Sequence, residues 1–347
     1  MTDLLLVSLG TTRGLRLSDA QLVTMIRQAG ASVEAIATRI GVTNVLRRGY
    51  PVNDVVEALA ARRALAAGMR VHRPRALIIS TTTAAFLVGD PGVPFAVWLD
   101  SPARLNRPGR LNAPLHWLER RQLARARVLL PHSPATIDAL PPGAAPSVLA
   151  PPPILAAPPA SDARDAFAIG YTPDPKAKGL GLLCAAWERT APSGGRLLIV
   201  GIPPDRARAF LDRRGIRLPA GAELVGMLPQ REFRGLLARA RVYVSAAAWE
   251  DFGIAPLEAL DRGAALVCAP GGGPFPALGL ARALAPAFVA ADRSPEALAR
   301  AIEAAFAAPD ARMVQYRMRA RAELEPYRPE ATVARLQAEV LPALLGS

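Results

Sequence analysis

Short apolar runs alternate with helical stretches along most of this chain, and this alternation limits the folds it can adopt. In the first half, five runs rich in leucine and β-branched residues are separated by segments of helical pattern. The runs are DLLLVSL, ASVEAIAT, RALIIST, PFAVWL and RVLLPHS, and the clearest helical segments are NDVVEALAARRALAAGM and APLHWLERRQLARA. Uninterrupted apolar runs suit strands that are buried on both faces. The pattern therefore predicts a parallel, doubly wound α/β sheet.

The alternation stops at a proline-rich segment and then begins again. Residues 149–162 read LAPPPILAAPPASD, and proline at this density interrupts helices and central strands. We therefore expect a first domain over residues 1–150, a linker over residues 151–162 and a second domain over residues 163–325. The second domain repeats the strand pattern in DAFAIGY, RLLIVG, AELVGM, RVYVSA, ALVCAP and AFVAA. Residues 326–347 contain PEATVARLQAEVLPALL, which predicts a final helix packing back towards the N-terminal domain.

The charge of the chain is basic and unevenly distributed. The net charge is +13, and residues 1–150 carry 18 arginines against 9 acidic residues, a net of +9. Seven arginines fall between Arg104 and Arg127. Such a patch suits an anionic membrane surface or a phosphorylated substrate, with a plain solvated surface as the alternative. Nucleic acid is the weakest candidate, because no nucleic-acid-binding module accompanies the charge.

Several familiar kinds of site are absent from the sequence. It contains no GxxxxGK[ST] phosphate loop, no GxGxxG after a strand, and no HExxH, GxSxG or DxD motif. We therefore expect no dinucleotide cofactor and no bound metal. Cys184 and Cys268 lie far apart in apolar runs and are interpreted as buried free thiols. The absence of a long apolar run and of a signal peptide indicates a cytoplasmic protein.

The most informative segment is RVYVSAAAWEDFGIAPLEALDRGAALVCAPGGG, residues 241–273. It predicts a buried strand, a loop, a helix, a second strand and a glycine-rich turn. The helix should begin between Gly253 and Pro256, since proline suits a first helical turn. Its N-terminus attracts anions, and Glu250 and Glu258 flank that start. This combination fits a ligand that has hydroxyl groups around a diphosphate, because carboxylates accept hydrogen bonds from hydroxyls.

These residues carry a resemblance to a known family. The run EDFGIAPLE, followed by EALxxG and a strand ending near a glycine pair, resembles the E-x7-E signature of family 4 glycosyltransferases. Similar segments, from FAIGY through AKGLGLLCAAW and VGMLPQREFRGLLARARVYVS, cover most of residues 166–305 in the family's order. The resemblance implies a GT-B fold, in which two Rossmann-like domains face a central cleft. It also implies a retaining enzyme that uses a nucleotide-sugar donor.

The resemblance assigns roles to residues of the second domain. Glu258 would bind the ribose and Glu250 the donor sugar, while Lys178, before Gly179, would contact the donor diphosphate. The chain has only two lysines, and the other, Lys176, would supply a second positive charge. The remaining donor-binding residues that it implies are Phe252, Gly253, Ile254, Gly170, Met227 and Leu228. The sequence departs from the family at Tyr171, where an arginine is usual.

The first domain resembles the family less closely. Gly10, Thr11 and Arg13 follow the first strand, where the family has a loop beside the donor phosphates and the acceptor. Asp100 ends the run PFAVWLD, where many relatives have a histidine that faces the reacting sugar. We interpret Asp100 as a candidate catalytic residue, with a helix cap or a turn residue as the alternative. His132, at the end of the next strand, is a second candidate or a structural histidine.

The sequence thus predicts a metal-independent, retaining glycosyltransferase that has no cofactor and uses a UDP- or GDP-linked sugar. The acceptor is unknown, and an anionic or membrane-presented acceptor would explain the basic first half. Peripheral attachment to the inner membrane face is then an alternative location to the free cytoplasm. Two other functions stay open: a nucleotide-sugar epimerase on the same fold, and an inactive nucleotide-sugar-binding protein. The base, the sugar and the oligomeric state do not follow from the sequence.

Overall fold

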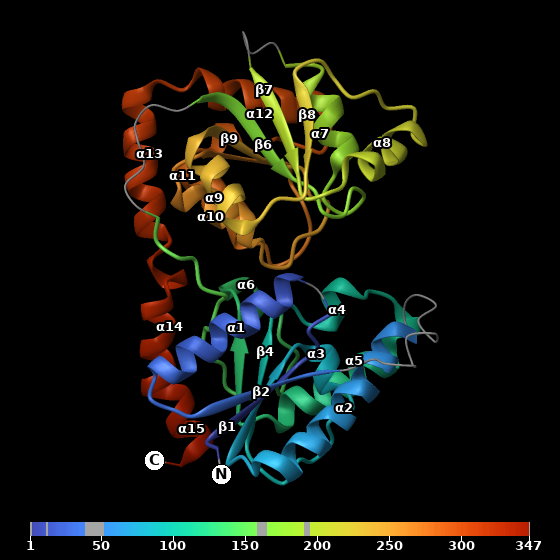
Figure 1. Cartoon of the computed structure of the whole chain (residues 1–347), viewed down its shortest axis with the longest axis vertical. Coiled ribbons are helices and arrows are strands. Elements are labelled where there is room, and N and C mark those ends of the chain that lie inside the picture. Colours follow the sequence, from blue (N-terminus) through green and yellow to red (C-terminus); the bar gives the residue numbers. More distant parts are fainter. Residues whose placement is uncertain (1, 12, 39–51, 158–164, 191–194, 347) are drawn as a thin grey trace. The chain divides into compact units, whose positions relative to one another are not determined.

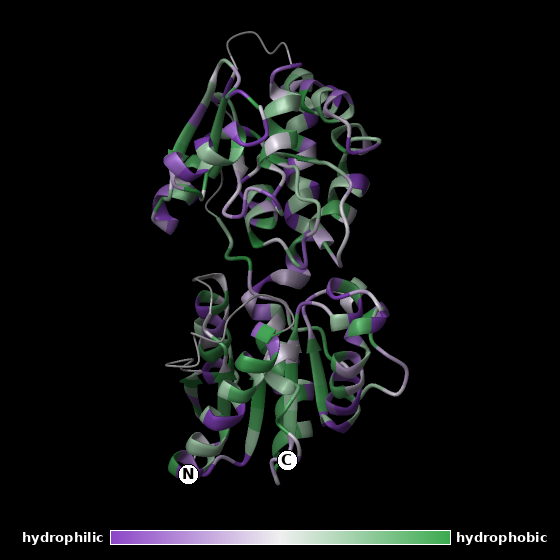
Figure 2. Ribbon diagram, turned by 90° about the vertical axis from the view of Figure 1, so that its right-hand side faces the viewer, coloured by the Kyte–Doolittle hydropathy of each residue, from purple (hydrophilic) through white to green (hydrophobic). Residues whose placement is uncertain are grey.

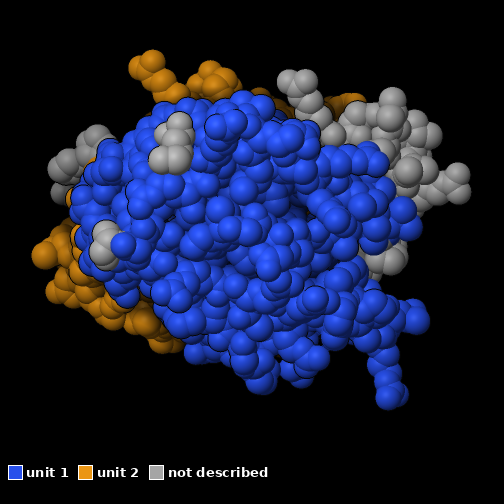
Figure 3. Space-filling view, turned by 90° about the horizontal axis from the view of Figure 1, so that it is seen from below, with its two compact units in different colours: residues 1–153, 326–347 blue, residues 154–325 orange. Residues whose placement is uncertain are grey.

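The chain divides into two compact units (Figure 3). The computed structural model describes every residue except 1, 12, 39–51, 158–164, 191–194 and 347. Unit 1 comprises residues 1–153 and 326–347, and unit 2 comprises residues 154–325. Part of the predicted linker, residues 158–162, lies outside the described residues. The C-terminal segment belongs to the same unit as the N-terminal domain.

Unit 1 contains a parallel five-stranded sheet of order β2-β1-β3-β4-β5 in the described part of the chain. The strands are β1 Leu4–Ser8, β2 Val33–Ala37, β3 Ala76–Ser80, β4 Phe95–Leu99 and β5 Val128–Pro131. The helices are α1 Arg13–Gln28, α2 Val52–His72, α3 Thr82–Ala85, α4 Ala103–Asn106, η2 Arg110–Asn112, α5 Ala113–Arg125, α6 Pro134–Asp138, α14 Pro329–Arg335, η5 Leu336–Val340 and α15 Leu341–Leu345. Each βαβ step joins parallel strands, as the alternating sequence pattern predicts.

Helices cover both faces of this sheet (Figure 1). Leu4 and Leu6 of β1 pack in one cluster with α1 and with Leu336 and Leu344 from the C-terminal helices. The alternate residues of β1 pack in a second cluster with α2, α3 and α5. Successive side chains of a strand point to opposite faces, so a strand with apolar residues at every position is buried on both sides. Figure 2 shows the resulting apolar strands in the interior of the unit.

Unit 2 repeats this architecture with a parallel sheet of order β10-β9-β6-β7-β8 among its described residues. The strands are β6 Asp165–Tyr171, β7 Arg196–Val200, β8 Ala222–Gly226, β9 Ala240–Ser245 and β10 Ala265–Cys268. The helices are α7 Leu180–Trp187, α8 Pro204–Asp212, α9 Gln230–Arg239, α10 Ile254–Asp261, α11 Pro276–Leu284, η3 Pro286–Phe288, α12 Pro295–Ala307 and α13 Asp310–Glu323. The short helix η4, Glu325–Tyr327, begins where unit 2 ends.

Two expectations about strands are wrong. The run ASVEAIAT does not form a strand buried on both faces, because β2 is an edge strand whose middle residues, including Glu34, are exposed. The run AFVAA, residues 287–291, is not a strand. Its first residues belong to the 3-10 helix η3, and Val289 makes only a single bridge to Cys268. Pro286, at the start of that helix, has a fixed φ and no N–H to donate to a ladder.

A helix that crosses a membrane must be both long and strongly apolar. None of the helices in the described part of the chain combines sufficient length with sufficient hydropathy to cross a bilayer.

Candidate active site

The loop between β6 and α7 holds both lysines of the chain. The Asp174 carboxylate accepts hydrogen bonds from the backbone N–H groups of Lys176 and Ala177, at 2.9 and 2.8 Å. The Asp174 carbonyl accepts another from the N–H of Lys178, at 2.9 Å. An aspartate that binds backbone groups shortly after it stabilises a tight turn. This turn determines where each lysine side chain starts.

Gly179 ends this loop and caps α7 in a left-handed conformation, with φ of 69°. A Cβ atom at this position would lie 2.0 Å from the carbonyl oxygen of Ala246, after β9. Only glycine fits such an approach of two backbones. The N–H of Ala248 also donates to the carbonyl of Ala177, at 2.9 Å. The loop after β6 is therefore bound directly to the loop after β9.

This close approach brings Lys178 to Glu250. The Lys178 ammonium donates to both oxygens of the Glu250 carboxylate, each at 2.7 Å. Both side chains are largely buried, with exposed fractions of 24% and 16%. Burial raises the pKa of Glu250, and the positive charge of Lys178 opposes that rise. The side chain of Lys176 is exposed.

The glycine-rich turn at residues 271–273 supports the loop that carries Glu250. The N–H of Glu250 donates to the carbonyl of Gly272, at 3.1 Å, and the N–H of Gly272 donates to the carbonyl of Ala248, at 2.9 Å. A Cβ on Gly273 would lie 2.2 Å from the carbonyl oxygen of Glu250. The sequence indicated only a turn here, whereas the structure assigns it the positioning of Glu250.

Helix α10 begins at Ile254, within the predicted interval. Gly253 precedes it with φ of 77°, and a Cβ there would lie 3.0 Å from Cγ of Glu250. Phe252 is buried, Ile254 is half-buried, and the first turn contains no acidic residue. No acidic side chain in this turn therefore offsets the positive end of the helix dipole, which lies at the free backbone N–H groups. An anionic ligand group is favoured at this end.

Glu258 lies in α10 and is paired with a residue that the sequence did not single out. One of its carboxylate oxygens, Oε1, accepts hydrogen bonds from Nε and Nη2 of Arg234 in α9, at 2.9 and 2.5 Å. Glu258 is only 4% exposed. Burying a carboxylate is costly unless a hydrogen-bonded partner such as this compensates for the lost water. The signal that would have found Arg234 is its place on the inner face of an amphipathic helix, beside Phe233.

The other predicted donor-binding residues have different surroundings. Gly170 is buried in β6, and a Cβ there would lie 2.6 Å from Leu183 of α7, so packing already requires glycine. Tyr171 packs its ring against Gly201 and against the ring of Phe233, whose centroid is 5.3 Å away. After β8, Met227 is 59% exposed and the side chain of Leu228 is half-buried.

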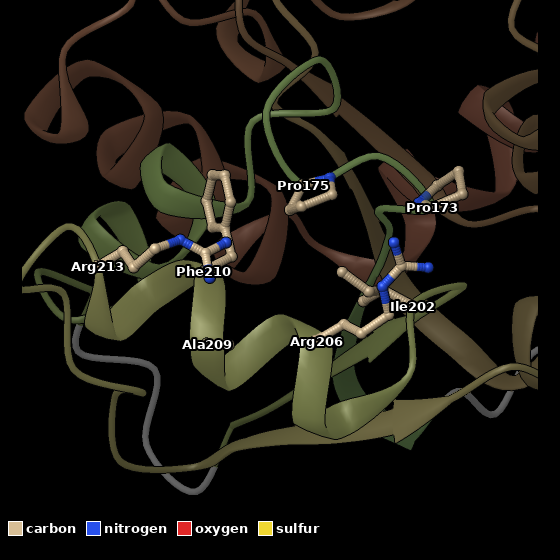
Figure 4. Close-up of a pocket in the computed structure, with 7 residues that line it drawn as sticks. All are labelled: Pro173, Pro175, Ile202, Arg206, Ala209, Phe210 and Arg213. Atoms are coloured by element: carbon tan, nitrogen blue, oxygen red, sulfur yellow. The ribbon is translucent and has the colours of Figure 1, made fainter. Parts of the chain in front are cut away.

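A surface pocket of about 350 Å³ lies beside this region (Figure 4). It is lined by Pro173, Pro175, Ile202, Arg206, Ala209, Phe210 and Arg213. The two prolines belong to the loop that carries Lys178, and the other side of the pocket is α8. None of the predicted donor-binding residues lines it, so the Lys178–Glu250 pair lies outside this pocket.

In unit 1, the predicted residues lie at the carboxyl ends of strands. Gly10 follows β1 with φ of 59°, and its carbonyl accepts a hydrogen bond from Nη1 of Arg16, at 2.8 Å. Thr11 is half-buried, and the side chain of Arg13 lies outside what the structure describes. Asp100 follows β4, and its Oδ1 accepts a hydrogen bond from the N–H of Ser101, at 2.8 Å. This bond belongs to a local turn, as in the alternative interpretation of Asp100.

His132, the second candidate, is a buried aromatic residue. Its ring centroid lies 4.6 Å from that of Trp98 in β4. Burial lowers the pKa of His132 to about 3. The imidazole is therefore neutral at physiological pH, which supports the structural interpretation of this residue.

Two buried carboxylates of unit 1 escaped the sequence analysis. Asp19 in α1 accepts hydrogen bonds from the hydroxyls of Ser8 and Ser80, at the ends of β1 and β3, and burial raises its pKa. Glu119 in α5 accepts hydrogen bonds from the N–H of Ala103 through both oxygens, at 2.8 and 3.0 Å. Burial raises the pKa of Glu119 to about 7. Acidic residues in helices commonly face solvent, so their burial was not predictable from sequence.

The seven arginines from Arg104 to Arg127 do not form one exposed patch. Arg107 is largely buried and forms a bidentate ion pair with Asp54 of α2, at 2.5 and 2.9 Å. The other six are exposed. Two of these bind neighbouring groups, since Arg125 donates to Asp90 and Arg127 to the carbonyl of Ala343.

Comparisons with known proteins identify the family of the second domain and the fold of the chain. Residues 163–307 match the family described as Glycosyl transferases group 1. No curated protein sequence matches the chain significantly. The structure is similar to sucrose-phosphate synthase from Thermosynechococcus elongatus, at 17% identity and a TM-score of 0.77, covering 100% of both chains.

Two further solved structures are similar over almost their whole length. The Anabaena protein HepE, solved in complex with UDP-glucose, is 15% identical with a TM-score of 0.70, covering 98% of this chain and 99% of its own. An E. coli protein titled trehalose-6-phosphate, bound with UDP-2-fluoro glucose, is 12% identical with the same TM-score and the same coverage. At such identities the likeness establishes the fold, which is GT-B with two Rossmann-like sheets, as predicted. Residues 163–307 are thus a domain of the group 1 glycosyl transferases, and the chain is a glycosyltransferase with the GT-B fold.

Proposed function

We propose that the protein transfers a sugar from a nucleotide-sugar donor to an acceptor hydroxyl, with retention of configuration at the sugar and without a metal ion. The observation that carries this proposal is the Lys178–Glu250 pair, held beside the start of α10. The two similar proteins solved with UDP-glucose and UDP-2-fluoro glucose support a nucleotide-sugar donor. A UDP-sugar is therefore the first donor to test, followed by a GDP-sugar.

The diphosphate would lie between Lys178 and the N-terminus of α10. A lysine ammonium has three N–H donors, so Lys178 can contact a phosphate oxygen while it keeps a hydrogen bond to Glu250. The backbone N–H groups of Gly253 and Ile254 would bind the distal phosphate or the sugar. Glu250 would then accept hydrogen bonds from sugar hydroxyls, and its own charge is balanced by Lys178.

The nucleoside would be held by the other carboxylate. Glu258 is held by Arg234 through a single oxygen, Oε1, in a geometry that suits contact of the second oxygen with the ribose hydroxyls. Met227 is exposed at the end of β8, where it and Leu228 would lie against the base. Arg234 thus acts as a positioning residue for Glu258.

Bond cleavage would require stabilisation of the leaving group rather than a strong base. The bond between the anomeric carbon and the diphosphate oxygen breaks, and its electron pair stays on the diphosphate. The sugar ring gains positive charge, and the acceptor oxygen attacks from the face that the diphosphate leaves, passing its proton to a phosphate oxygen. Lys178 and the start of α10 would stabilise the negative charge as it grows. Asp100, in unit 1, would orient the acceptor hydroxyl.

The test begins with binding of donors. A ligand at a hundredfold excess over its dissociation constant adds about 2.7 kcal/mol of apparent stability, so thermal shifts with UDP-, GDP- and ADP-sugars identify the base. Transfer to a panel of acceptors then gives a product whose anomeric configuration is read by NMR. An isomerised donor in the absence of any acceptor indicates an epimerase instead. Tight binding of a donor without turnover on any acceptor would indicate the inactive binding protein.

A further inference from the structure

The outer faces of α2 and α5, both in unit 1, have an unusual composition. Every exposed residue of α2 is valine, leucine, alanine or arginine, and every exposed residue of α5 is alanine, proline, tryptophan or arginine. The exposed set on α2 is Val52, Val55, Leu59, Arg62, Arg63, Ala66, Ala67, Arg70 and Val71. The exposed set on α5 is Ala113, Pro114, Trp117, Arg120, Arg121, Ala124 and Arg125. A helix face in contact with water alone normally includes acidic or uncharged polar residues as well.

The large exposed apolar side chains of unit 1 gather on these same elements. Among the residues that the structure describes, they are Val52, Val55, Leu59, Val71, Leu111 and Trp117. Leu111 lies in η2, directly before α5, and is 96% exposed, while Trp117 is 50% exposed. Arg121 lies over the Trp117 ring, 5.5 Å from its centroid. Isolated exposed apolar residues are common, but a group of them among arginines indicates an interaction surface.

The acidic residues of these helices do not reduce the positive charge of the outer face, because they point inwards. Asp54 of α2 is held by Arg107, and Glu57 of α2 is buried. Glu119, the acidic residue of α5, is bound to the N–H of Ala103. The arginines of the outer face therefore act on an approaching charge with little internal compensation, apart from the contact of Arg125 with Asp90.

The two helices lie on the same side of the sheet, and both pack against α3 (Figure 1). Ala58 of α2 and Leu115 of α5 belong to one apolar cluster, together with Phe86. Their inner faces thus share a core, which places both outer faces on the side of the unit that faces away from the sheet. α1 and the C-terminal helices cover the opposite face.

We propose that the outer face of α2 and α5, together with Leu111, is a docking surface for an anionic phospholipid bilayer. Leucine and tryptophan side chains enter the interfacial region of a bilayer, where tryptophan is enriched, while arginines remain at the level of the headgroup phosphates. Basic residues near an anionic leaflet each strengthen binding. A second copy of the chain fits less well, because two faces with the same positive charge repel each other. Nucleic acid would use the arginines but not Leu111.

This inference deepens the proposed function, since it brings the enzyme to a surface that can present an acceptor. Its test contains neither donor nor acceptor. Failure of lipid binding therefore leaves sugar transfer untouched, and failure of sugar transfer leaves lipid binding untouched.

The experiment measures co-sedimentation of the full chain with vesicles. Vesicles of phosphatidylcholine mixed with phosphatidylglycerol should bind the protein, and vesicles of phosphatidylcholine alone should not. Added salt should weaken binding, because it screens the attraction between the exposed arginines and the anionic headgroups. At physiological ionic strength, such screening already acts beyond about 8 Å. Trp117 fluorescence should shift to shorter wavelength on binding, and the shift should disappear in Trp117→Phe, since Trp98 and Trp187 are buried and Trp249 is half-buried in unit 2, outside the proposed surface.

Two variants test the face itself, and one pair serves as a control. Arg120→Ala with Arg121→Ala should weaken the vesicle partition about tenfold or more, given the contribution of each basic residue near an anionic surface. Leu111→Gln should weaken it about threefold to tenfold, since it removes apolar area from the interface. Val314→Gln and Met318→Gln remove exposed apolar side chains from α13 of unit 2, which also carries exposed acidic residues, and should leave the partition unchanged.

Four outcomes would overturn the proposal: equal binding to neutral and anionic vesicles, no binding to either, equal loss in the α13 variants, or a fluorescence shift that survives Trp117→Phe. Light scattering that shows a dimer lost in Leu111→Gln would assign the face to a second copy instead. Displacement of the protein from vesicles by RNA that binds the Leu111→Gln variant equally well would assign the arginines to nucleic acid.

Discussion

Four buried carboxylates, two in each unit, differ in their partners. In unit 2, Glu250 is hydrogen-bonded to the Lys178 ammonium and Glu258 to the Arg234 guanidinium. In unit 1, Asp19 is hydrogen-bonded to two serine hydroxyls, and Glu119 to a backbone N–H group. Arg107 acts on Glu119 only as a neighbouring positive charge that lowers its pKa, and burial, the larger effect, still raises that pKa. Glu250 and Glu258 of unit 2 thus have cationic partners, whereas Asp19 and Glu119 of unit 1 have neutral ones. Asp54 of unit 1 is an exception within its unit, because Arg107 forms an ion pair with it.

This difference separates carboxylates that suit ligand binding from carboxylates that support the fold. A carboxylate paired with a cation can exchange part of that contact for a ligand that brings both negative charge and hydroxyl groups, as a nucleotide sugar does. A carboxylate bonded to serines or to a backbone N–H mainly supports the ends of strands and helices. The surfaces differ in the same sense, because the exposed faces of α2 and α5 carry arginine without acid, while α13 of unit 2 mixes both charges.

The largest effect is expected when the Lys178 ammonium, the cationic partner of Glu250, is removed. Lys178→Ala should lower turnover by a factor on the order of 10²–10³, because it removes the positive charge that we propose stabilises the leaving diphosphate. Lys178→Arg should recover part of the activity, since the guanidinium keeps the charge but changes reach and geometry. Turnover and nucleotide affinity of both variants are compared with those of Lys176→Ala, which should change little because Lys176 is exposed. Greater damage from Lys176→Ala would transfer the role to that lysine.

The second prediction concerns the neutral partners of Glu119. The pKa of the Glu119 carboxyl is about 7 in the folded protein, against an ordinary value of 4.5. As pH rises, Glu119 therefore loses its proton in the unfolded chain before it does so in the folded protein. The stability that Glu119 contributes is therefore complete below about pH 4.5, falls as pH rises to about 7, and is constant above. Glu119→Gln should remove this fall, which amounts to about 3 kcal/mol. Urea unfolding at pH 5 and pH 8 measures it.

The control for this prediction is Glu232→Gln, an exposed glutamate in α9 of unit 2. It should leave the pH dependence of unfolding as it is in the unmodified chain. If Glu119→Gln also leaves that dependence unchanged, the proposed contrast between neutral and cationic partners is wrong for Glu119.

A smaller effect is expected from the second ion pair of unit 2. Glu258→Ala should weaken nucleotide affinity about tenfold, because the proposed hydrogen bonds to the ribose are lost. Glu250→Ala should instead lower mainly turnover. Arg234→Gln should weaken nucleotide affinity about threefold, since Glu258 loses the partner that orients it. Titration calorimetry with the nucleoside diphosphate measures each affinity, with Glu232→Ala as the control, and no effect from either glutamate variant would refute both roles.

The smallest expected effect is that of a chelator. If Lys178 and the start of α10 balance the diphosphate charge, EDTA should leave the transfer rate unchanged. The measurement is the initial rate before and after EDTA treatment, with Mn²⁺ added back. Loss of activity that Mn²⁺ restores would show that the cations of unit 2 do not suffice.

The strands were the most predictable part of the fold. Runs such as LLLVS and ALIIS are apolar at every position, and only a strand covered on both faces buries them completely. Edges were less predictable. The edge strand β2 and the run after Pro286 are also rich in apolar residues, like the buried strands. Whether such a run pairs within a sheet depends on neighbours that are distant in the sequence.

For the site, the sequence by itself determined which residues are present at the start of α10 and which loop carries the lysines. The spacing of Glu250, Gly253 and Glu258 follows from one local segment, so local rules suffice to place a helix start between them. Only the tertiary structure decided that Lys178 reaches Glu250, that Arg234 reaches Glu258, and that Glu119 is buried. These contacts join residues from different loops and helices, and their geometry depends on close backbone approaches such as that of Gly179 to Ala246, which no local pattern encodes.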